Sequence, residues 1–192
     1  MLEEYVTNAS CCAGCSAINL ASGPASGSYA TRVSTPGSGA SALTTVGQTF
    51  TTGGECVILS SFTLELRPQN TINNPVSITA LLYTFDLSNN LVIGPRLASQ
   101  SISAVQSQSS LPVTFPQPVQ LSPATSYAII LTTSGLGQGS TAYSINVQRS
   151  DYGNPNEILD GKFITQNSGD NPGAIETNPF FQSFENLAIT VN

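Results

Sequence analysis

The chain has no histidine and no tryptophan, and only 8% of its 192 residues are charged. Without histidine, Ser-His-Asp and Cys-His catalysis and histidine-ligated metals are excluded. Haem attachment at "CAGCS" is excluded too, because Ser16 stands where that motif requires histidine. An average soluble domain has about 25% charged residues. With a net charge of −6 and Lys162 as its single lysine, the chain has no basic patch, and we expect no nucleic-acid partner.

Hydrophobic runs long enough to cross a bilayer are also absent, so we expect no membrane insertion. The N-terminus, "MLEEYVTNAS", lacks the basic and apolar regions of a standard secretory signal. Because uncharged polar surfaces are common in extracellular and particle-forming β proteins, we still expect an extracellular, cell-surface or spore-surface location. The chain would then be a mature sequence, be exported without a standard signal, or be released by lysis of the producing cell.

Alternating apolar residues are plentiful from Thr44 to the C-terminus. Phe62, Leu64 and Leu66 share one face of "FTLEL", and "VSITALLYTF", "SYAIILTT", "YSINV" and "LAITV" alternate in the same way. Turn-forming clusters rich in Gly, Asn and Pro separate these runs, and no window has a capped helical stripe. Many short strands with regular turns predict an all-β, antiparallel sandwich without helices.

Composition divides the chain into three parts. Residues 1–20 hold three of the four cysteines and are predicted to form a flexible N-terminal arm. Residues 21–43, rich in Gly and Ser, are predicted to be a linker. Residues 44–192 are predicted to form the sandwich, a length suited to one domain with its own core.

The sandwich region resembles a known group of bacterial surface proteins. The segments "GQTFTTGGECVILSSFTLEL", "PVSITALLYTFD", "PVTFPQPVQLSPATSYAIILTTSG" and "ENLAITV" follow the order of the choice-of-anchor domains, over about residues 45–192. The resemblance implies a jelly-roll β-sandwich. It implies little about function, because one fold serves many functions.

Catalytic and metal sites have few candidates. No nucleophile–base pair is identifiable, so we expect no enzyme and no required cofactor. The loop "SDYGNPNEILDGKF" carries oxygen ligands of the kind calcium uses, although their spacing does not fit an EF-hand. The candidate ligands of a structural calcium are Asp151, Asn154, Asn156, Glu157 and Asp160. The alternative interpretation is a polar loop that uses Asn, Asp and Gly for its turns.

Carbohydrate binding is the alternative function that we carry, since jelly rolls often bind sugars. Sugar platforms need exposed aromatic faces, and the chain has no tryptophan. Tyr143 and Tyr152 remain as candidates. Tyr83 lies on a strand with two apolar faces, which predicts a core position.

The four cysteines, Cys11, Cys12, Cys15 and Cys56, allow three intrachain pairings. Cys11 and Cys12 do not pair easily with each other, because a disulfide needs a specific geometry between its Cβ atoms. A small Cys12–Cys15 loop, a Cys₄ zinc site and free thiols in a reducing cytosol are the alternatives. Three thiols on a flexible arm are well placed to reach another molecule, so we predict intermolecular disulfides and a self-assembling polymer.

The arm has a resemblance of its own. "YVTNASCCAGC" is similar to the N-terminal connector of bacterial endospore appendage subunits, which are jelly rolls whose connector cysteines bond to neighbouring subunits. The resemblance implies that Cys11, Cys12 and Cys15 belong to the connector and that Cys56 receives a neighbour's thiol. It also implies that export needs no signal, because such subunits are made in the mother cell. The predicted function is a structural subunit of an extracellular fibre, crosslinked through its arm.

Overall fold

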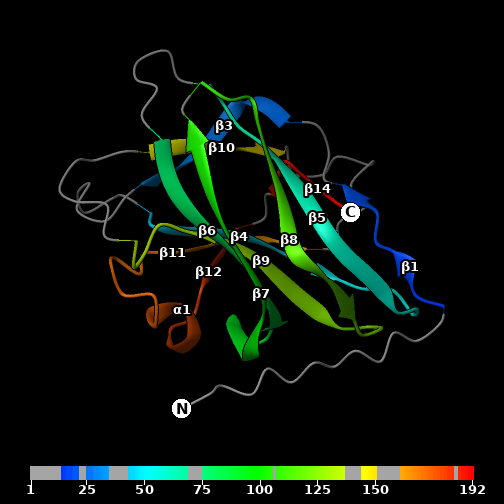
Figure 1. Cartoon of the computed structure of the whole chain (residues 1–192). Coiled ribbons are helices and arrows are strands. Elements are labelled where there is room, and N and C mark those ends of the chain that lie inside the picture. Colours follow the sequence, from blue (N-terminus) through cyan, green and yellow to red (C-terminus); the bar gives the residue numbers. More distant parts are fainter. Residues whose placement is uncertain are drawn as a thin grey trace.

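The computed structural model is an all-β sandwich (Figure 1). It describes residues 14–21, 25–34, 43–68, 75–105, 107–136, 144–150, 161–183 and 186–192. In chain order the elements are β1 (Ser16–Ala17), β2 (Leu20–Ala21), β3 (Ala25–Ser34), β4 (Thr45–Thr51), β5 (Val57–Glu65), β6 (Pro75–Asp86), β7 (Leu91–Val105), β8 (Ser110–Leu121), β9 (Ser126–Thr132), β10 (Ser144–Ser150), β11 (Phe163–Gln166), α1 (Ala174–Thr177), β12 (Phe181–Ser183), β13 (Asn186–Leu187) and β14 (Ile189–Val191). The predicted fold class is confirmed, with the single turn of α1 as the one described exception to the helix-free expectation.

The strands form three hydrogen-bonded sheets around a common core. The largest has the order β12-β11-β4-β9-β6-β7, and a second has the order β13-β10-β3. In the third, β5 pairs with β1 and β14 along one edge and with β8 along the other, and β2 follows β14. A bridge between Leu66 and Val147 joins the end of β5 to β10. Among the described strands every pair is antiparallel except β1 with β5, which is parallel.

Side chains of the six-stranded sheet alternate between two cores, as the period-2 pattern predicts. The main core, shared with the other two sheets, takes from β6 and β9 the side chains of Val76, Ile78, Ala80, Leu82, Tyr127, Ile129 and Leu131. The second core lies on the opposite face, against α1, and contains Leu81, Tyr83, Phe85, Val92, Ala128, Ile130, Ile164, Ile175 and Phe180. The face shared by Val76, Ile78, Ala80 and Leu82 is thus confirmed, and Tyr83 is buried as predicted.

The segment around α1 closes the outer face of the six-stranded sheet. Ile175 and Phe180 insert into the second core. The amide of Phe180 donates a hydrogen bond to the carbonyl of Asn90 in the β6–β7 turn, at 2.8 Å. The side chain of Gln166 donates another to the carbonyl of Asn178, also at 2.8 Å. Because both faces of its centre are covered, this sheet has nearly continuous apolar runs on β6 and β9.

Part of the predicted linker, residues 21–43, forms strands. β3 pairs with β10 over residues 30–34 and again at Ala25, with Val33 opposite Ile145, and the Val33 side chain is fully buried. Leu20 of β2 pairs with Val191 of β14. Small and polar residues such as most of those in "ASGSYATRVS" give a weak apolar period, and the backbone hydrogen bonds of a strand pair leave no pattern in the sequence. The Gly- and Ser-rich composition therefore predicts a linker in a segment where the structure has a strand.

Gly47 in β4 marks a close approach of strands. A Cβ atom at this position would lie 2.6 Å from the carbonyl oxygen of Ile129 and 3.1 Å from Cγ1 of Ile164. We therefore expect Gly47→Ala to lower the free energy of unfolding by about 1–3 kcal/mol, the usual range for overpacking. Chemical denaturation measures the change, with Gly53→Ala as the control because its added methyl group would meet no atom within 4 Å. Equal stability of the two variants would contradict this close packing.

Candidate crosslinking site

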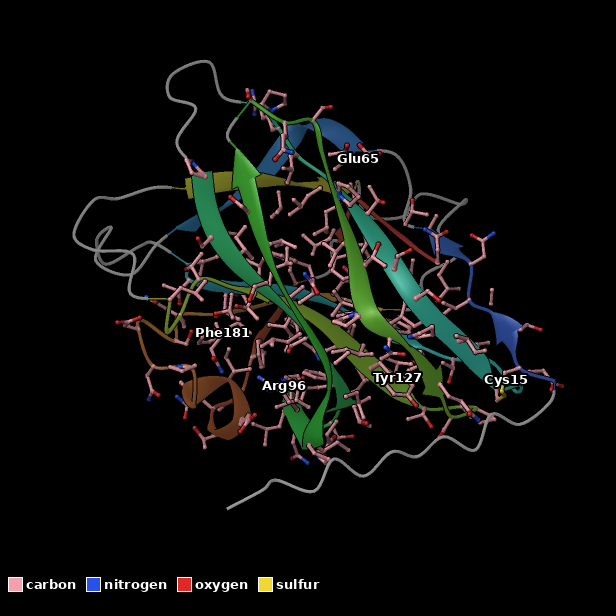
Figure 2. All side chains as sticks on the ribbon, viewed as in Figure 1. Cys15, Glu65, Arg96, Tyr127 and Phe181 are labelled. Atoms are coloured by element: carbon pink, nitrogen blue, oxygen red, sulfur yellow. A yellow bond between two sulfur atoms is a disulfide. The ribbon has the colours of Figure 1, made fainter. Side chains whose placement is uncertain are left out.

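Cys15 and Cys56 meet at one end of the sandwich. Cys15 directly precedes β1, and Cys56 directly precedes β5, after the turn at residues 52–55. The parallel register places Ser16 opposite Val57, so the two preceding residues also come side by side. Their Cα atoms are 5.1 Å apart and their sulfur atoms form a disulfide, within the usual range of Cα separations for such bonds. Figure 2 shows Cys15 and this bond near the start of β5.

The base of the arm belongs to the sandwich. The amide of Ile18 donates a hydrogen bond to the carbonyl of Ile58 at 3.0 Å, and its side chain is 4% exposed in the main core. Leu20 packs against the same core with partial exposure. The disulfide, the β1–β5 pairing and this buried isoleucine thus fix residues 15–21 on the surface of the third sheet. The weak signal for this in the sequence is the i, i+2 pair of Ile18 and Leu20.

The disulfide itself lies at the surface. Both cysteines are partly exposed, and Gly14 and Ser16 on either side of Cys15 are exposed. The side chain of Gln120 on β8 is a polar neighbour of the bond, with its Nε2 atom 4.0 Å from the Cys56 sulfur. A cavity of about 220 Å³ is lined on one side by residues 17–20 and on the other by the end of β4 and the residues that follow it, 51–53. Solvent and a neighbouring chain can therefore reach this end of the sandwich.

The four predicted crosslinking cysteines are thus divided into two pairs. Cys15 and Cys56, predicted to take part in bonds between subunits, are bonded to each other within one chain. Cys11 and Cys12 lie outside the described residues. The register of β1 on β5 accounts for the intrachain pairing. The sequence pattern did not reveal it because β1 is only two residues long.

The other predicted site residues are either buried or outside the described residues. The calcium candidates Asp151, Asn154, Asn156, Glu157 and Asp160 lie outside the described residues, as do Tyr143 and Tyr152. Tyr83 is buried and offers no exposed ring for a sugar. In the described ranges no three His, Cys, Asp or Glu side chains gather closely enough to hold a metal ion. The same ranges contain no helix with the length and apolar character needed to cross a membrane.

Comparison with known protein families and with curated proteins finds no match for this chain. Function is therefore inferred from the cysteines, the sheet edges and the cavities of the molecule itself.

Proposed function

We propose that the protein is a structural subunit of a self-assembling extracellular fibre or appendage, joined to its neighbours by disulfides from the N-terminal arm. The pairing of Cys15 with Cys56 carries the proposal. Once that bond is closed, Cys11 and Cys12 have no cysteine of their own chain left except each other. Adjacent cysteines do not easily meet the geometry of a disulfide. Their bonds are therefore directed to a second copy.

Two thiols per subunit suffice for a covalent chain of any length. A subunit with one bridging thiol can form only a dimer, whereas a subunit with two can bond to a neighbour on each side. In this arrangement Cys11 of one subunit bonds to Cys12 of the next. Each bond forms as two thiols lose two protons and two electrons to an oxidant such as oxidised glutathione. Cys15 and Cys56 have a different role from the predicted one, because their bond anchors the arm on its own sandwich.

The sheet edges support association of identical subunits. Within the described residues β7 pairs only with β6 and β12 only with β11, so these two are the outer strands of the six-stranded sheet. Each edge strand has exposed apolar side chains, Ile93 and Leu97 on β7 and Phe181 on β12. Arg96 is the single charged residue among the fifteen of β7. Edges with so little charge offer little electrostatic opposition to pairing, and contact between two different edges builds an open filament where the rotation between subunits does not close a ring.

Serine variants of the arm test the proposal. After oxidation with oxidised glutathione, the parent protein should give ladders on non-reducing gels. Cys11→Ser and Cys12→Ser should each form nothing longer than a dimer of twice the 19.9 kDa chain mass, because one bridging thiol cannot join a subunit to two neighbours. The double variant should run as one monomer band. Reductant with denaturant should return the parent to the same band, and electron microscopy should show filaments for the parent.

Two results would contradict the proposal. Ladders that persist in the Cys11→Ser, Cys12→Ser double variant would show that other cysteines make the crosslinks. A parent protein that stays monomeric under oxidising conditions, with Cys11 and Cys12 free, would show that the arm does not join subunits.

A further inference from the structure

A second cavity lies on the outer face of the six-stranded sheet, far from the disulfide. It has a volume of about 380 Å³ and separates β6 and β9 from α1 and the loop before it. Leu81, Ile175 and Pro172 provide apolar walls, and Tyr83, Arg96 and Glu176 bring polar groups. Figure 2 places Arg96 on β7, well apart from Cys15. A cavity of this size with apolar walls and a few convergent polar groups is typical of a small-molecule site.

A bulge in β7 brings Arg96 to the cavity. Leu82 pairs with Ala98 and Thr84 pairs with Ile93, so four residues of β7 lie opposite Tyr83 alone. The bulge contains Gly94 with φ +72°, a conformation that glycine adopts without strain. Within the described residues Arg96 forms neither an ion pair nor a hydrogen bond. Bulges often redirect a side chain beside a functional site, and this one presents an unpaired guanidinium.

The opposite wall presents a carboxylate held in place by a buried tyrosine. The Tyr83 hydroxyl donates a hydrogen bond to Oε1 of Glu176 at 2.7 Å. Burial, followed by this hydrogen bond, raises the pKa of Tyr83 well above its ordinary value, so the hydroxyl remains a donor. The other oxygen, Oε2, accepts no hydrogen bond from a described residue. Arg96 and Glu176, both exposed to solvent, thus line one open cavity with opposite charges and no ion pair between them.

We propose that this cavity binds a small zwitterion, namely an α-amino acid with an apolar side chain. The guanidinium of Arg96 receives the carboxylate, since its planar fork matches a carboxylate group. The free oxygen of Glu176 receives the ammonium group. The walls of Leu81, Ile175 and Pro172 receive the side chain. A ligand with only one of the two charges makes one charge-assisted contact instead of two, so it should bind more weakly.

Equilibrium dialysis with labelled L-leucine tests the site on the full-length protein, and it applies equally to monomers and polymers. We expect saturable binding with one site per chain and a Kd on the order of 1 mM. Unlabelled leucinamide, which lacks the carboxylate, and isocaproate, which lacks the ammonium group, should compete at least tenfold less well than leucine. Arg96→Gln and Glu176→Gln should each weaken binding at least tenfold. Arg67→Gln should bind as the parent does, because Arg67 is an exposed arginine outside the cavity.

Two binding results would overturn the site. The first is the absence of saturable binding at 20-fold the expected Kd. The second is equal competition by leucinamide and isocaproate, which would show apolar binding without recognition of charge. A Tyr83→Phe variant keeps the ring and removes the hydrogen bond to Glu176. It distinguishes a role of Tyr83 in positioning the Glu176 carboxylate from a role in folding. It should retain the parent's circular dichroism and melting behaviour but bind leucine more weakly.

Discussion

Replacement of both Cys15 and Cys56 by serine should lower the free energy of unfolding by about 4 kcal/mol. The bond joins residues 41 positions apart, and it restricts the unfolded chain by closing a loop of that length. The chain-entropy relation gives about 4 kcal/mol for such a loop. Denaturant unfolding measures the difference, and both proteins should carry Cys11→Ser and Cys12→Ser so that crosslinks between chains do not intervene.

Reductant provides the control for this effect. It should shift the denaturant midpoint of the protein that contains Cys15 and Cys56 toward the midpoint of the serine variant. The midpoint of the serine variant itself should not change. A difference below about 1 kcal/mol between the two oxidised proteins would contradict a closed Cys15–Cys56 bond in the folded chain.

Shortening the Ile18 side chain to alanine should have the next largest effect on the free energy of unfolding. Its side chain is 4% exposed in the main core, so Ile18→Ala removes buried methyl groups and leaves a cavity where the arm meets the sandwich. Such substitutions cost about 2–5 kcal/mol. Leu20→Ala is the matched control on the same arm, because Leu20 is partly exposed and should cost less. Thermal and denaturant unfolding of both variants, with the disulfide intact, measure the difference.

The comparison of these two variants tests whether the arm begins inside the fold. If Ile18→Ala costs no more than Leu20→Ala, the Ile18 side chain is not buried in the main core, and this part of the arm lies outside the fold. Crosslinking through Cys11 and Cys12 should be unchanged in both variants, because neither substitution touches those thiols.

The sandwich could be predicted from the sequence because its strongest signals are local. Val76, Ile78, Ala80 and Leu82 share one buried face of β6, and this alternation can be recognised in a single window. Phe62, Leu64 and Leu66 do the same on β5 and its end, and all three are buried. The side chains at these positions are buried on one face of a strand, and such burial places an apolar residue at every second position of the sequence.

The attachment of the N-terminal segment could not be predicted in the same way. β1 has two residues, and its place is set by a parallel register with a strand some forty residues away along the chain. β3 pairs with β10, and that backbone pairing leaves no apolar period in "ASGSYATRVS". The Cys15–Cys56 bond follows from the β1–β5 register rather than from cysteine spacing. The cavity beside Arg96 depends on a bulge in β7, whose sign in the sequence is the Gly94-Pro95 pair inside a strand.

The most direct test of the covalent fibre is disulfide mapping in a polymer made from mixed isotopes. Equal amounts of unlabelled and ¹⁵N-labelled reduced protein are mixed, oxidised, digested with elastase to cut between Cys12 and Cys15, and analysed by mass spectrometry. Peptides carrying Cys11 and Cys12 should stay joined to those of other subunits, because no cleavage separates the two adjacent residues. Each joined species should contain unlabelled and labelled copies in random combination, at about 1:2:1 for a joined pair. Peptides joined through Cys15 and Cys56 should appear only in the two unmixed forms. Mixed forms of the Cys15–Cys56 peptide, or unmixed forms alone for Cys11 and Cys12, would contradict the account.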